Sequence, residues 1–92
     1  MYLRLTRGRF DATRSDEVMA AVPAIAAALR GLPGVQDVRV GIDRASGRTL
    51  SLTTFDTLEQ AQFSRDQLSS VLVPMHALGW EPEAPEIYEA TA

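Results

Sequence analysis

The sequence predicts a small α+β fold whose strands and helices follow the order β-α-β-β-α-β. Several short segments alternate apolar and polar residues in period two, which is typical of strands, and two longer segments repeat apolar residues with the 3.6-residue period of a helix. Capping-box patterns and turns with proline or glycine separate these segments. The chain has 92 residues, the length of one domain, so we expect a single α+β domain over residues 1–92.

The first third of the chain predicts a strand and a helix. Residues 2–10 alternate in period two and form the strand. Thr13 with Asp16 three residues later resembles a capping box and would begin the helix. Pro23 predicts a kink or a restart of this helix, because proline removes a backbone donor and crowds the preceding turn. The apolar stripe of the helix consists of Val18, Val22, Ile25, Leu29 and Leu32.

The middle of the chain predicts a β-hairpin followed by a second helix. Residues 35–44 and 48–55 are the two strands, joined by the short Ala-Ser-Gly segment 45–47. Thr57 with Gln60 forms another capping-box pattern and opens the helix, which Pro74 should end or bend. The inward stripe of this helix would be Leu58, Ala61, Arg65, Leu68, Leu72 and Met75.

The end of the chain predicts a turn over residues 76–80, an acidic loop with prolines over 81–85 and a final strand over 86–91. With right-handed crossovers, these elements give a ferredoxin-like, four-stranded antiparallel sheet with both helices on one face. Leu3 and Leu5 would then lie on the face opposite Tyr2 and Phe10. In the same way, Leu50 and Leu52 would lie on the face opposite Phe55. An apolar sheet face of this size predicts a homodimer that covers it.

Composition excludes several functional classes. The chain has no cysteine, and therefore no disulfide or thiolate metal site. A net charge of −3 argues against nucleic acid as a partner. No apolar run approaches the roughly 20 residues that span a bilayer, so we expect a cytoplasmic protein with no membrane partner. The chain also lacks lysine and asparagine, which fits a GC-rich bacterial genome and excludes lysine Schiff-base chemistry and any mechanism that needs an asparagine side chain.

The order and spacing of three segments resemble the antibiotic biosynthesis monooxygenase-like family of dimeric α+β barrel proteins. The segments are Leu-Pro-Gly-Val at 32–35, the hairpin from Ile42-Asp43-Arg44 to Ser51-Leu52, and Pro-Glu-Ile-Tyr-Glu at 85–89. The resemblance implies a dimer with sheets packed face to face and a pocket between helices and sheet in each subunit. It does not imply one activity, because the fold hosts oxygenases, haem-degrading enzymes and isomerases.

The residue sets of the active branches of this family fit the chain only in part. The haem-degrading branch uses an asparagine, a tryptophan and a histidine, but this chain has no asparagine and His76 precedes Trp80. The cofactor-independent oxygenases use Asn, Trp, Tyr and Arg around an aromatic substrate. Trp80, Arg4 and either tyrosine, Tyr2 or Tyr88, could supply three of these types, with no cofactor and no metal expected.

Each candidate site residue also has a structural interpretation. His76 is a base or metal ligand at a pocket mouth, or a partly exposed residue near a helix C-terminus. Trp80 walls a pocket, or closes the open end of the core. Arg4 anchors an anion, or pairs with the acidic residues of the last strand. Arg65, within an apolar stripe, pairs with a carboxylate or binds substrate.

Three functions remain open on this basis. The first is a small dimeric protein that binds an apolar or aromatic molecule between helices and sheet. The second is a cofactor-independent monooxygenase or isomerase acting on an aromatic or polyketide-like substrate, with His76, Trp80, Tyr88 and Arg4 as candidate catalytic residues. The third is a structural or regulatory interaction protein whose pocket is filled by its own side chains. A cavity of a few hundred cubic ångströms would favour the first two.

Overall fold

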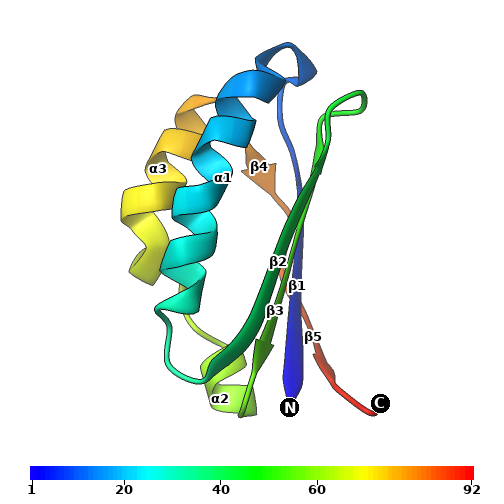
Figure 1. Cartoon of the computed structure of the whole chain (residues 1–92), viewed down its shortest axis with the longest axis vertical. Helices are drawn as coiled ribbons and strands as arrows, with labels where there is room; N and C mark the ends of the chain where they lie inside the picture. The colour runs from blue at the N-terminus through cyan, green and yellow to red at the C-terminus, as the bar shows by residue number, and fades with distance from the viewer.

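The computed structural model describes residues 1–92 as two layers, an antiparallel sheet and a layer of helices on one of its faces. Figure 1 shows α1 and α3 side by side against the sheet, whose other face carries no helix. The predicted α+β class, ferredoxin-like layout and placement of helices on one face are confirmed.

Three long strands form the body of the sheet. They are β1 (Tyr2–Arg9), β2 (Val35–Asp43) and β3 (Arg48–Phe55), paired in the order β2-β3-β1. In the register of β1 with β3, Arg4 lies opposite Thr53 and Leu5 opposite Leu52. Because successive side chains of a strand point to opposite faces of the sheet, Arg4 faces the helices and Leu5 faces away from them.

The last part of the sheet differs from the prediction of four strands. Two short strands, β4 (Glu81–Pro82) and β5 (Glu86–Glu89), both pair with β1 and make the sheet five-stranded. The segment predicted as a loop over 81–85 therefore begins with two residues of strand. Because Pro82 and Pro85 lack a backbone donor, they interrupt the ladder and divide the edge into two pieces.

The first helix is α1 (Ser15–Arg30), which runs through Pro23 without splitting into two helices. The expected capping box of Thr13 and Asp16 is wrong. The side chain of Asp11 instead accepts a hydrogen bond from the backbone N–H of Thr13 and caps a short 3₁₀ turn, η1 (Ala12–Arg14), that leads into α1. Asp11 lies two residues after the end of β1 at Arg9, so the first turn begins before the predicted capping box.

The predicted second helix is three separate pieces. These are α2 (Leu58–Ala61), the 3₁₀ turn η2 (Arg65–Leu68) and α3 (Ser69–Ala77). The capping box of Thr57 and Gln60 is confirmed at the start of α2. Leu58 is exposed, contrary to its place in the predicted inward stripe, whereas the later apolar members of that stripe are buried. Pro74 does not end α3, which continues through His76 to Ala77.

Arg4 contacts the backbone at the point where the second helix breaks. Its guanidinium donates hydrogen bonds to the backbone carbonyls of Ala61 and Phe63, at 2.9 and 2.8 Å. In an uninterrupted helix these carbonyls would accept from N–H groups four residues later. After the break, the Ser64 side chain accepts from the N–H of Asp66 and starts η2.

The core lies between the helices and the inner face of the sheet. Phe55 of β3 and Val18 of α1 are fully buried, and the hydrophobic cluster extends to Trp80 at the end beyond α3. On the outer face, Leu50 keeps 43% of its surface exposed and Tyr88 keeps 53%. The expected bare face with apolar residues is therefore present.

Candidate functional site

A small cavity lies between α1, α3 and the inner face of the sheet. Its volume is about 60 Å³, room for only a few water molecules and well below the few hundred cubic ångströms expected of a ligand pocket. Ten of its fourteen lining residues are hydrophobic. The apolar walls come from α1, β2 and α3, with Val22, Val40 and Leu72 among them. A ligand larger than a few atoms would require these side chains to move.

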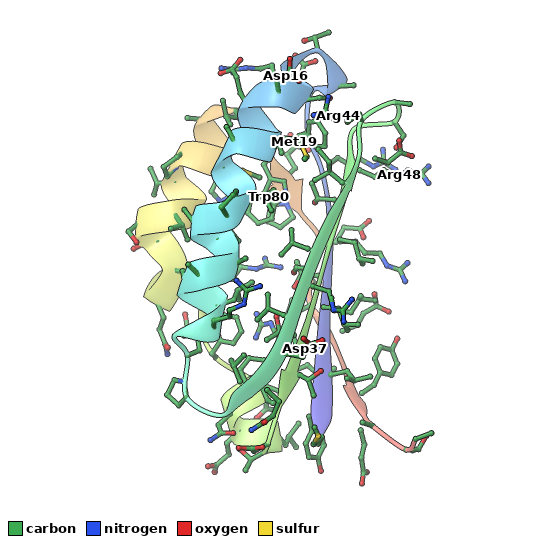
Figure 2. All side chains as sticks on the ribbon, viewed as in Figure 1. Asp16, Met19, Asp37, Arg44, Arg48 and Trp80 are labelled. Carbon is green, nitrogen blue, oxygen red and sulfur yellow. The ribbon has the colours of Figure 1, made fainter.

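Trp80 forms one wall of the cavity and is 9% exposed. Figure 2 shows it in the space between α1 and the sheet. The indole Nε1 donates a hydrogen bond to Thr49 Oγ1 at 3.0 Å. Gly8 makes room for this contact, because a Cβ atom there would lie 2.6 Å from the indole nitrogen. A glycine inside a strand pattern often marks such a close approach, so Gly8 was a signal that sequence reasoning missed.

Polar side chains of two neighbouring strands form the floor of the cavity. Thr6 of β1 lies directly opposite Ser51 of β3, and both side chains face the helices. Thr49, which holds Trp80, belongs to the same strand. These residues were not predicted as site residues, because a threonine or serine on a sheet face gives no signal until the opposing strand is known.

Arg65 is the only charged residue in the lining of the cavity. It lies in η2 and its Nη2 donates a hydrogen bond to the backbone carbonyl of Glu83. The expected pairing of Arg65 with an acidic side chain is not found, because the partner is this main-chain oxygen. The break after α2 places Arg65 at the start of a new turn, where its side chain can cross toward the 83–85 segment.

Arg4 is 6% exposed and faces the helices from β1. Besides its two carbonyl acceptors, its guanidinium carbon lies 3.9 Å from the centroid of the Phe63 ring. Burial lowers the pKa of Arg4 from its usual value, and the nearby charge of Arg65 lowers it further. From the inner face of the sheet, Arg4 thus holds the segment between α2 and η2 in position.

His76 and Trp80 lie next to each other. The two rings are 5.3 Å apart between centroids, and His76 Nδ1 lies 3.1 Å from the backbone oxygen of Trp80. Because a carbonyl oxygen only accepts, Nδ1 carries the proton in this contact. The imidazole itself is exposed and is not part of the cavity lining, so it stands behind the wall that Trp80 forms.

Tyr88 lies on the other face of the sheet. It pairs with Leu3 across β1 and β5, and its hydroxyl donates a hydrogen bond to Glu86 Oε1 at 2.7 Å. This hydrogen bond to the carboxylate raises the pKa of Tyr88 above its ordinary value. The structure therefore distributes the four sequence candidates over three places: Trp80 and His76 together, Arg4 below the α2–η2 segment, and Tyr88 outside.

The outer face also carries a larger groove, of about 550 Å³, near the tip of the β2–β3 hairpin. Arg7, Arg9 and Arg48 line it together with Asp43 and Glu83. Arg9 lies directly opposite Arg48 in the register of β1 and β3. Figure 2 shows Arg48 pointing away from the helices.

Neither a metal cluster nor a membrane span emerges from the geometry. No group of three or more His, Cys, Asp or Glu side chains lies close enough together to hold a metal ion. None of the helices combines the length and the apolar character needed to cross a bilayer.

Comparison with known proteins finds similarity in structure only. No protein-family model and no curated protein matches the sequence. Among solved structures, a Deinococcus radiodurans protein with the provisional name antibiotic biosynthesis monooxygenase superposes with a TM-score of 0.78 at 18% identity, over 100% of this chain and 94% of that one. HapK from Hahella chejuensis gives a TM-score of 0.78 at 13% identity, over 99% and 93% of the two chains.

SnoaB from Streptomyces nogalater, a cofactor-independent oxygenase, is a further structural neighbour. It superposes with a TM-score of 0.73 at 13% identity, over 99% of this chain and 93% of SnoaB. At these identities the likeness concerns the fold. The resemblance to antibiotic biosynthesis monooxygenase-like proteins that the sequence indicated is confirmed at that level, over the whole chain.

Proposed function

We propose that this protein binds an apolar or aromatic small molecule between α1, α3 and the sheet, in the cavity that widens when its apolar side chains move apart, and we assign it no catalysis. The observation that carries the proposal is the composition of the lining: it combines apolar walls and one tryptophan with a polar floor from the sheet and a single charge, Arg65 of η2. Such a mixture of apolar surface and a few convergent polar groups is typical of small-molecule sites.

The chemistry of the lining favours binding over catalysis. It contains no histidine, aspartate or glutamate, so no side chain there exchanges a proton readily near neutral pH. His76, the only histidine of the chain, contacts Trp80 from outside the cavity. A ligand in the cavity would therefore meet groups that orient it but no general base.

Two other functions have a specific observation in their favour. The structural likeness to SnoaB supports a cofactor-independent monooxygenase or isomerase acting on an aromatic or polyketide-like substrate, for which His76, Trp80, Tyr88 and Arg4 are the first residues to change. The small volume of the cavity supports an interaction protein whose pocket is filled by its own side chains.

A homodimer of single-domain subunits is part of the proposal. The outer sheet face presents Leu3, Leu5, Leu50 and Leu52 from adjacent strands, and a second copy would remove this surface from water. The same face carries both basic and acidic side chains, which lets two copies related by a two-fold axis pair opposite charges. The cytoplasmic location and bacterial origin expected from the sequence belong to the same proposal.

Fluorescence of Trp80, the only tryptophan, offers the test. The neutral apolar fluorophore N-phenylnaphthylamine should quench it by energy transfer on binding. Val22→Phe places a larger side chain in the lining and should abolish binding. Val73→Phe is the matched control, because Val73 is 63% exposed on α3 and lies outside the lining. The absence of saturable quenching, or quenching that Val22→Phe leaves unchanged, would contradict the proposed site.

Native mass spectrometry of the gently purified protein tests the assembly and the ligand together. A dimer that carries an additional small mass supports both parts of the proposal. A bare dimer that also fails to quench favours the interaction protein. A monomer would contradict the dimer.

A further inference from the structure

Two arginines are withdrawn from solvent, Arg4 almost completely and Arg65 in part, and neither has a carboxylate partner. The four ion pairs of the structure use Arg7, Arg14, Arg39 and Arg44. Arg4 and Arg65 take part in none of them, although Arg4 is almost completely buried and Arg65 is half-buried. Removing a cation from water without an opposite charge is costly, so such a pair needs an explanation.

The hydrogen bonds of the two arginines show which guanidinium still has N–H donors free to bind a ligand. Arg4 donates to two backbone carbonyls and stacks on Phe63, and both contacts fix it in place. Arg65 donates through Nη2 to one carbonyl, that of Glu83. Because a guanidinium has five N–H donors, Arg65 keeps donors free on a group that lines the cavity.

The floor of the cavity provides a second set of donors in the same lining as this charge. The hydroxyls of Thr6 and Ser51 belong to residues opposite each other in the β1–β3 register, and both residues line the cavity with Arg65. The indole nitrogen of Trp80 is already satisfied by Thr49, so the Trp80 ring offers its apolar surface. The cavity thus combines an apolar wall with a cation and two hydroxyl donors, and it has no acidic side chain.

We propose that the ligand of this cavity is an apolar acid, a flat hydrocarbon ring system carrying an anionic oxygen group such as a carboxylate, and that Arg65 binds this group. The inference rests on the proposed function, because it names the chemical class of the molecule that occupies the cavity. The ring system is larger than the cavity, so the apolar side chains of the lining move apart to admit it beside Val22 and Trp80, and its anionic oxygen accepts from Arg65. Arg4 acts through position: its hydrogen bonds hold the segment that presents Arg65.

The test compares two probes with the same ring system, naphthoic acid and naphthylmethanol. Naphthoic acid is ionised at neutral pH, as carboxylic acids with a pKa of about 4 are, whereas the alcohol is neutral. Isothermal titration calorimetry measures both dissociation constants at fixed low ionic strength. Because a hydrogen bond between charged groups outweighs a neutral one, wild-type protein should bind naphthoate about tenfold more tightly than the alcohol.

Variants of Arg65 assign this preference. Arg65→Met should bind both probes equally, and Arg65→Lys should retain part of the preference because it keeps the positive charge. Arg30→Met is the matched control: Arg30 is exposed at the end of α1 and outside the cavity, so the preference should stay at its wild-type value. Circular dichroism of each variant verifies folding. The comparison of the two probes on wild-type protein tests the inference even if a variant fails to fold.

The outcomes separate this inference from the proposal on which it rests. Equal binding of both probes by the wild-type protein, or tighter binding of the alcohol, would overturn the apolar-acid inference and leave the cavity as a neutral ligand site. A preference that survives Arg65→Met would overturn the role of Arg65. Binding of neither probe would overturn both the ligand class and the proposed site.

Discussion

The two faces of the sheet differ in how their polar groups are satisfied. On the inner face, Arg4 donates to two carbonyls and Thr49 accepts from Trp80. No buried side-chain nitrogen or oxygen of the molecule lacks a partner. On the outer face, Arg9 stands opposite Arg48, a placement of like charges that destabilises a sheet. The buried polar groups of the inner face are thus all paired within the subunit, whereas the outer face keeps a repulsive pair of charges.

This difference teaches that alternation along one strand can serve two purposes. In β1, Arg4, Thr6 and Gly8 face the helices, while Leu3 and Leu5 point the other way. The inward residues build the core and the proposed ligand site. The outward residues leave apolar surface and positive charge uncovered in the subunit. Changes on the inner face should therefore affect stability, and changes on the outer face should affect assembly.

Removing a fully buried ring should have the largest effect on stability. Phe55→Ala leaves a void beside Phe63 and should lower the free energy of unfolding by about 3–5 kcal/mol. Leu50→Ala, on the outer face of the same strand, should cost less than about 1 kcal/mol in the monomer. Urea denaturation measures both, and similar losses would break the contrast between the two faces.

Arg4 tests whether a buried cation holds the break in the second helix. Arg4→Met removes two charge-assisted hydrogen bonds and leaves the carbonyls of Ala61 and Phe63 without their donor. The free energy of unfolding should fall by about 2–3 kcal/mol. Arg9→Met, an exposed arginine on the outer face of the same strand, should change it by less than about 0.5 kcal/mol. Equal effects in urea denaturation would argue against the positioning role of Arg4.

A charge on the outer face tests assembly. Leu52 lies opposite Leu5 at the middle of this face, and Leu52→Glu should weaken dimerisation at least tenfold by burying an unpaired carboxylate. Leu58→Glu on α2 is the control, since Leu58 is exposed away from the outer face. Sedimentation velocity over a concentration series gives the dimer dissociation constants, and dimers that tolerate Leu52→Glu would place the interface elsewhere.

The smallest expected effect is a change in one pKa on the outer face. Glu86 accepts the Tyr88 hydroxyl and raises the pKa of Tyr88 because the carboxylate favours the protonated phenol. Glu86→Gln removes the negative charge, while Arg7 remains, so the pKa of Tyr88 should fall toward or below its ordinary value. Ultraviolet titration in a Tyr2→Phe background isolates Tyr88. An unchanged midpoint would show that Glu86 does not hold the phenol.

The candidate site was less predictable than the fold because its members come from separate segments. Trp80 was predicted either to wall a pocket or to close the open end of the core, and it belongs to both the cavity lining and the core cluster. Thr6 and Ser51 gave no sign of their role, since only the β1–β3 register brings them together. Arg65 was noted as a charge in an apolar stripe, but its partner is a backbone carbonyl, which no residue type encodes.

The sequence by itself determined the elements whose signals are local. Period-two alternation gave β1, β2 and β3 to within one residue, and the pattern of Thr57 and Gln60 gave the start of α2, because side-chain periodicity and capping depend on neighbours in the chain. Only the tertiary structure decided where the second helix breaks. The donors that take its carbonyls come from Arg4, 57 residues earlier, and no local pattern near Ala61 can report a partner so distant in the chain.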